Sequence, residues 1–171
     1  MNLLKEILKE HSKAQTSKIV KYVGRDQSRF DELIKLFLKG PYRVTQRAGW
    51  PISNLVIRHP EFIKPHLRKV LDILSKPGIH DAVKRNITRL LQFITIPKKF
   101  QGAVVDICLE YLANPKEAIA VRVFSMTVLT NLAMENPELK NEIVPLIEDQ
   151  LPFASAGFRS RAKRTLKQLK S

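Results

Sequence analysis

Apolar residues recur along most of the chain at the three- and four-residue steps of an α-helix. In one representative stretch, Ile63, Leu67, Val70 and Leu74 fall on a single helical face. No segment alternates apolar and polar residues around an Asn-Gly or Asp-Gly turn, which is the pattern of a β-hairpin. The sequence therefore predicts an all-α protein.

Prolines and arginines recur along the chain with a period of 36 to 40 residues. The first proline series follows the ends of apolar stretches, where proline cannot continue a helix, and the second stands where proline can open one. Three independent markers at one period predict an array of helix pairs. The three series are Pro41, Pro77, Pro115 and Pro152; Pro60, Pro97 and Pro137; and Arg47, Arg85, Arg122 and Arg161.

The helix pairs follow from this punctuation. Because one pair cannot bury its apolar face alone, we expect the pairs to stack on a continuous core as a single domain over residues 1–171. In that domain, residues 1–25 form an atypical N-terminal capping pair and residues 158–170 a basic C-terminal capping helix. After an opening pair at 2–12 and 16–24, the expected first helices are 29–39, 60–76, 97–112 and 137–149, and the expected second helices are 42–58, 79–94, 116–133 and 158–170.

The expected second helices carry a motif that resembles a known repeat. Residues 81–91 read Asp-Ala-Val-Lys-Arg-Asn-Ile-Thr-Arg-Leu-Leu, and residues 120–133 contain Val-Arg followed by small and leucine positions. This pattern is similar to that of HEAT repeats over about residues 30–169. The resemblance implies a right-handed α-solenoid of about five HEAT-like helix pairs, with the second helices lining the concave face. The chain departs from the pattern at Gly49-Trp50-Pro51, inside an expected second helix.

The chain is strongly basic, and the excess lies on one row of expected helices. It has 30 Lys and Arg residues against 16 Asp and Glu residues, which gives a formal net charge of +14. From residue 29 onward, the expected second helices carry a net charge of +12 and the expected first helices a net charge of zero. If the second helices line a concave face, the protein presents a basic groove suited to a nucleic-acid backbone or an acidic protein segment.

The periodic arginines have two possible roles. In HEAT repeats this arginine usually bonds an acidic side chain and holds adjacent repeats together. Arg85 follows Asp81 by four residues, and the resemblance therefore implies a structural role for it. Arg122 follows Glu117 by five residues, which implies the same role.

Other basic side chains of the row are candidates for contact with an anion. Arg47 and Arg161 have no acidic residue among the eight residues before them, so we expect them to be better placed for phosphate. Trp50 is the only tryptophan and is either a base-stacking aromatic or a large core residue. The candidate groove residues are Arg43, Arg47, Trp50, Lys84, Arg89, Arg159, Arg161, Lys163 and Arg164.

No catalytic, metal or cofactor motif is present in the sequence. The single Cys108 lies among apolar residues, so we expect it to be buried and unreactive. The longest stretch without a charge, 123–134, is too short to span a membrane, and the charged N-terminus does not resemble a signal peptide. We therefore expect a cytoplasmic protein that does not associate with a membrane and binds no metal or cofactor. No two of the four histidines have the i, i+4 spacing of helical metal ligands: His11, His59, His66 and His80.

Three functions remain open at this point. The favoured description is a non-catalytic scaffold whose basic groove takes an acidic protein segment, and nucleic-acid binding is the more specific hypothesis within it. The second is a nucleic-acid-binding protein that contacts the phosphate backbone with little sequence preference. The third is an enzyme, because the architecture and basicity are similar to those of the HEAT-like alkylpurine DNA glycosylases. Asp81 is the one acid in the basic row beside arginines, but no motif specific to that family is present.

Overall fold

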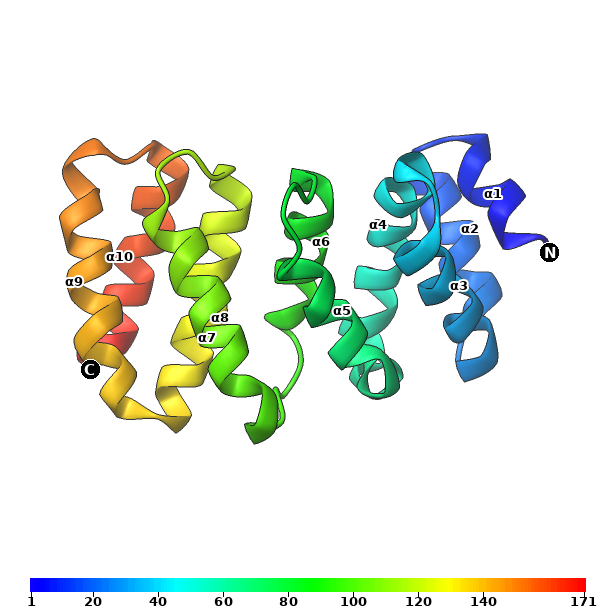
Figure 1. Ribbon diagram of the computed structural model, residues 1–171. Helices are drawn as coiled ribbons and strands as arrows, with labels where there is room; N and C mark the ends of the chain where they lie inside the picture. Colours follow the sequence, from blue (N-terminus) through cyan, green and yellow to red (C-terminus); the bar gives the residue numbers. More distant parts are fainter. The chain divides into compact units, whose positions relative to one another are not determined.

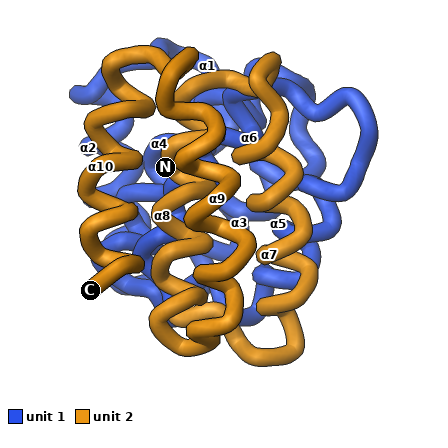
Figure 2. The backbone as a smooth tube through the Cα atoms, turned by 90° about the vertical axis from the view of Figure 1, so that its left-hand side faces the viewer, with its two compact units in different colours: residues 1–94 blue, residues 95–171 orange.

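The computed structural model describes residues 1–171 and contains ten α-helices, three short 3₁₀-helices and no strand (Figure 1). This confirms the all-α prediction. The chain forms two compact units, residues 1–94 and residues 95–171 (Figure 2). The expectation that all the pairs stack on one continuous core stays a prediction. None of the helices is both long and apolar enough to cross a lipid bilayer.

The first unit is organised around one long helix, α4. This helix packs against α1, α2, α3, η1 and α6, and it buries Val44, Ile52, Leu55 and Val56. The six α-helices and the 3₁₀-helix of the unit are α1 (Leu3–Lys9), α2 (Lys13–Val23), α3 (Gln27–Lys39), α4 (Tyr42–Arg58), η1 (Pro60–His66), α5 (Leu67–Leu74) and α6 (Asp81–Leu91).

The first three helices begin at short polar side chains. Asn2, Ser12 and Asp26 precede α1, α2 and α3, and each side-chain oxygen accepts a hydrogen bond from the backbone amide three residues later. Such bonds satisfy amides that have no partner inside the helix. The start of each helix is therefore set by its local sequence.

Gly49 lets α4 and α6 approach closely. A Cβ atom at this position would lie 2.3 Å from Nδ2 and 2.9 Å from Cβ of Asn86 on α6. The departure of Gly49-Trp50-Pro51 from the HEAT pattern thus has a packing reason at its first residue. Helix α4 continues through the buried Pro51 to Arg58.

The expected helix at 60–76 is wrong in its first half. Residues Pro60–His66 form a 3₁₀-helix, and α5 begins only at Leu67. Pro65 lies inside this segment and has no backbone amide, so it cannot donate the bond that an α-helix starting at Pro60 requires. The tighter 3₁₀ turn still buries Phe62 and Ile63.

The second unit consists of two helix pairs. Helix α8 packs on α7 and α10, and α9 packs on α7 and α10 (Figure 1). The core includes Met126, Phe158 and Cys108, and burial raises the pKa of the Cys108 thiol to about 12. The prediction that Cys108 is buried is confirmed. The elements are α7 (Lys98–Ala113), α8 (Ile119–Glu135), η2 (Pro137–Leu139), α9 (Lys140–Gln150), η3 (Leu151–Phe153) and α10 (Ala156–Lys170).

Candidate functional site

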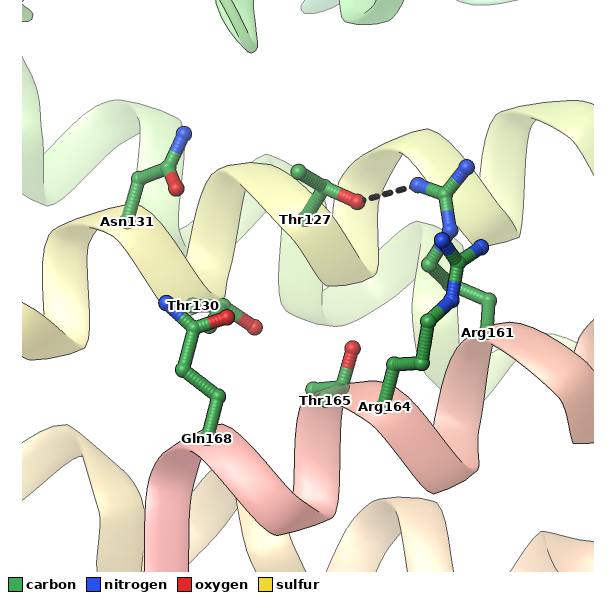
Figure 3. Close-up of a pocket in the computed structure, with 7 residues that line it drawn as sticks. All are labelled: Thr127, Thr130, Asn131, Arg161, Arg164, Thr165 and Gln168. Atoms are coloured by element: carbon green, nitrogen blue, oxygen red, sulfur yellow. Dashed lines mark hydrogen bonds between the residues drawn. The ribbon is translucent and has the colours of Figure 1, made fainter. Parts of the chain in front are cut away.

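A pocket of about 240 Å³ lined by polar residue types lies between α8 and α10, the second helix of each pair in the second unit (Figure 3). We call it the α8–α10 pocket. No carboxylate lines it. Its lining residues are Thr127, Thr130, Asn131, Arg161, Arg164, Thr165 and Gln168.

The pocket exists because polar residues interrupt the apolar faces of both helices at helical spacing. On α8 the polar positions stand three and four residues apart, at Thr127, Thr130 and Asn131. The Thr130 hydroxyl donates to the backbone carbonyl of Met126 at 2.8 Å, so its hydrogen is already bonded within the helix. Between these positions Val128 and Leu129 remain fully buried, and the polar stripe does not open the core.

Two guanidinium groups lie at one end of the pocket (Figure 3). Arg161 is half-buried and donates a hydrogen bond from Nη1 to the hydroxyl of Thr127. Burial and the nearby charge of Arg164 both lower the pKa of Arg161. Neither arginine forms an ion pair. The site therefore holds two like charges without compensation, which an entering anion would relieve.

The remaining basic side chains of α10 point to solvent. Arg159, Lys163 and Lys167 are exposed and form no ion pair, whereas Lys170 pairs with Glu148 of α9. The pocket thus brings together Arg161 and Arg164 of the predicted candidates, and it does not include Arg159 or Lys163. These two lie on the open surface of the same helix.

In the first unit, two candidate arginines are tied to the preceding repeat. Arg47 on α4 donates from Nη1 to the backbone carbonyl of Leu8 at 2.8 Å, near the end of α1. Arg89 on α6 donates from Nη2 to Oδ1 of Asn54 at 3.4 Å, and burial, followed by the charge of Arg85, lowers its pKa. Arg43 is exposed at the start of α4, and Lys84 is half-buried on α6.

The four periodic arginines, Arg47, Arg85, Arg122 and Arg161, have contacts that differ from those expected from the sequence. Arg85 is exposed and forms no ion pair with Asp81. Arg47 and Arg161 each donate a hydrogen bond to an acceptor within the chain, and their predicted contact with an anion stays a prediction. Those acceptors are a carbonyl and a hydroxyl located 39 and 34 residues earlier, about one repeat period. Neither acceptor is acidic and neither lies in the same repeat as its arginine, so the local sequence around each arginine does not indicate it.

Arg122 has a structural role, but with different partners from the expected Glu117. It donates to the side chain of Gln150 at the end of α9, and its guanidinium lies 4.6 Å from the ring centroid of Phe158 on α10. Burial lowers the pKa of Arg122. This one side chain therefore connects α8, α9 and α10.

Trp50 is half-buried rather than part of the closed core. Its ring meets the His11 ring edge-on at a centroid distance of 5.9 Å. The tryptophan thus stands where α4 meets the turn between α1 and α2. Its role in binding stays a prediction.

The sequence interpretation missed the neutral half of the pocket. Thr127, Thr130 and Asn131 on α8 and Thr165 and Gln168 on α10 were not among the candidates. A signal was present, since polar residues recur at three- and four-residue steps on two helices one repeat apart.

No group of three or more His, Cys, Asp or Glu side chains is placed to hold a metal ion. Asp81, the residue that an enzymatic interpretation requires, is exposed in the first turn of α6. It does not belong to the α8–α10 pocket.

Comparison with known families settles the class of protein. A model of the HEAT repeat domain matches residues 3–169, nearly the whole chain. The chain belongs to the HEAT-repeat family. The resemblance drawn from the second-helix motif is therefore confirmed, and it extends into the opening pair. HEAT and armadillo repeats typically form non-enzymatic scaffolds. Among curated proteins, no relative of this HEAT-repeat chain was found.

The solved structures with the same fold include engineered and designed proteins. An engineered protein from a structural genomics consortium has a TM-score of 0.66 at 17% identity, with 98% of this chain and 78% of that chain covered. A designed armadillo repeat protein in complex with the peptide (KR)4 has a TM-score of 0.65 at 16% identity, covering 98% and 80%. A second designed armadillo repeat protein has a TM-score of 0.64 at 16% identity, again covering 98% and 80%. These similarities support the predicted α-solenoid class of this HEAT-repeat protein.

Proposed function

We propose that this HEAT-repeat protein is a non-catalytic scaffold that binds an acidic protein segment through the basic side chains of its second helices. One observation carries the proposal: α10 has six basic residues and no acidic residue, and most of them have no acidic partner. Like charges three and four residues apart on one helix repel each other. An acidic partner would offset that repulsion and gain charge-assisted hydrogen bonds.

In the second unit, the first helix of each pair lacks this basic excess: α9 is net acidic and α7 is neutral. Helix α9 carries Glu142, Glu148 and Asp149 against a single Lys140, and α7 has two acidic and two basic residues. The basic excess of the second unit therefore belongs to α10. Such an asymmetry orients an acidic partner and speeds its association.

The fold is suited to extended peptides. The designed armadillo repeat protein with the same fold is in complex with the peptide (KR)4, which is basic. The second helices of this chain are themselves basic, so charge complementarity requires a partner of the opposite sign. This favours a segment rich in glutamate and aspartate.

Nucleic acid offers the same sign of charge, and the test must therefore separate the two partners. We suggest fluorescence anisotropy with a labelled glutamate-rich peptide and with labelled single-stranded and duplex oligonucleotides, at low and moderate salt. We expect the peptide to bind more tightly than either oligonucleotide, with an affinity that falls as salt is raised. Tight binding of an oligonucleotide with none of the peptide would contradict the proposal.

A double charge reversal on α10 tests whether this helix forms the surface that binds the acidic peptide. The double substitution Arg159→Glu with Lys163→Glu reverses two exposed side chains of α10 that carry no internal contact. We expect it to weaken peptide binding at least about tenfold, since each juxtaposed like charge is costly. The matched control, Lys98→Glu with Lys99→Glu on α7, changes the net charge equally and is expected to have little effect. Equal losses in the two variants would indicate attraction by net charge alone.

A further inference from the structure

The α8–α10 pocket has a chemistry more specific than the open basic surface around it. Its charged part consists of Arg161 and Arg164, whose charges interact, and its other lining residues are three threonines, an asparagine and a glutamine. Resting on the proposed function, we infer that this pocket recognises a phosphorylated serine or threonine side chain within the acidic segment. The open surface of α10 would then supply general attraction, and the pocket would select one modified residue.

The two guanidiniums match the charge of a phosphate monoester. A phosphorylated side chain carries about −1.5 to −2 charges near neutral pH and three terminal oxygens, whereas a carboxylate carries one charge and two oxygens. Two adjacent arginines therefore remain partly uncompensated by one glutamate and become fully compensated by one phosphate. The planar fork of arginine can also bond two phosphate oxygens at once.

The site is already partly organised before a ligand arrives. Thr127 holds the guanidinium of Arg161 in place through a hydrogen bond to Nη1. Arg164 is exposed and forms no hydrogen bond or ion pair that would have to break. Arg161 is held by Thr127, and Arg164 is exposed and can turn toward an anion in the pocket. Few internal bonds are therefore lost when an anion binds.

The lining favours the tip of a side chain over a nucleic-acid backbone. The pocket is bounded by α8 on one side and α10 on the other, and a group that projects from a peptide can enter between them. A backbone phosphodiester carries a single charge and is linked to sugars on both sides. Gln168, at the opposite end from the arginines, can bond the peptide backbone next to the phosphorylated residue.

The test compares two short acidic peptides that differ only at the central residue, phosphoserine in one and glutamate in the other. For the unmodified full chain we expect the phosphoserine peptide to bind about tenfold more tightly or better, from added charge-assisted hydrogen bonds. The ratio of the two affinities is the readout. The two peptides share every other acidic residue, so the ratio reports the pocket together with the extra charge of phosphoserine, and the Lys163→Gln variant separates these two contributions.

Arg164→Gln is the decisive variant, because the Arg164 side chain is exposed and forms no hydrogen bond or ion pair in the free protein. We expect it to bring the ratio of affinities close to one. The matched control Lys163→Gln removes the same charge from the next residue, outside the pocket, and we expect it to weaken both peptides while preserving the ratio. Arg161→Lys, which keeps the charge but loses the fork, should lower the ratio as well.

Different failures have different meanings. A ratio near one in the unmodified chain, or one that Lys163→Gln reduces as much as Arg164→Gln does, would overturn the pocket assignment and leave the acidic-segment proposal intact. Absence of binding by both peptides would overturn both. Both proposals would also be overturned if neither peptide bound and a 5′-phosphorylated oligonucleotide bound more tightly than its unphosphorylated form, with a difference that Arg164→Gln removes.

Discussion

At the scale of single residues, Gly49 has a clear packing role. In a helix interior, alanine is normally more stabilising than glycine by about 1 kcal/mol. At Gly49 an added methyl group would instead collide with the Asn86 side chain, including its Cβ. We therefore expect Gly49→Ala to lower the free energy of unfolding by about 1–3 kcal/mol, as measured by urea denaturation.

Gly102 provides the control for that experiment. It lies inside α7, and a Cβ there would meet no atom within 4 Å. Gly102→Ala should therefore stabilise the protein by about 0.5–1 kcal/mol through helix propensity alone. If both substitutions stabilise the protein, the close approach of α4 and α6 at Gly49 is not as described.

Arg122 provides a second test at the same scale. Removing its side chain eliminates the contact with the Phe158 ring and leaves Gln150 without its donor. We expect Arg122→Ala to destabilise the protein by about 2 kcal/mol in a denaturation experiment. Arg159→Ala, which removes an exposed arginine without such contacts, should change stability by less than about 0.5 kcal/mol. Equal effects would contradict a structural role for Arg122.

At the scale of elements, Glu6 joins the first two helices through its carboxylate. It accepts hydrogen bonds from Lys18, at 2.8 Å, and Gln15, at 2.7 Å, on α2, and from Lys9, at 3.0 Å, on its own helix. The Lys18 bond, followed by those of Gln15 and Lys9, lowers the pKa of Glu6 from 4.5 to about 2. A carboxyl group with a depressed pKa stabilises the folded state above its unfolded pKa and loses that contribution as the pH falls.

The first unit should therefore lose stability as the pH falls from about 4.5 to about 2. Substitution of Glu6 by Gln should reduce the slope of stability against pH in this window, measured by thermal unfolding. Asp72→Asn serves as the control, because Asp72 is exposed and forms no ion pair. An unchanged slope in the Glu6 variant would show that the α1–α2 connection does not depend on charge.

Most helix bounds could be predicted from the sequence because proline and capping chemistry act locally. Helices α3 and α7 end at Lys39 and Ala113, shortly before Pro41 and Pro115, as expected. The split at Pro65 was missed because two prolines within one expected helix have opposite effects, one opening a helix and the other preventing its α-form.

The site was less predictable because its contacts cross from one repeat to the next. The partner of Arg161 is Thr127, and the partner of Arg89 is Asn54, 35 residues earlier. Periodicity fixes which residues recur, but the lateral position of one helix on its neighbour decides which side chains meet. That position depends on packing details such as the absent side chain at Gly49.

At the scale of the whole molecule, charge is the property that links the family fold to a function. The chain has a net charge of +14 and a sequence pI of about 10.1. Because HEAT-repeat scaffolds host many functions, the fold alone does not select a partner. The distribution of charge over the second helices, and above all over α10, is what favours an acidic one.

The most direct test of the central claim is amide hydrogen exchange of the full chain, with and without a saturating glutamate-rich peptide. We expect exchange to slow in α10 and in the facing part of α8, while α7 and α9 remain unchanged. Slower exchange confined to α7 and α9, with none in α10, would contradict the assignment of binding to the second helices.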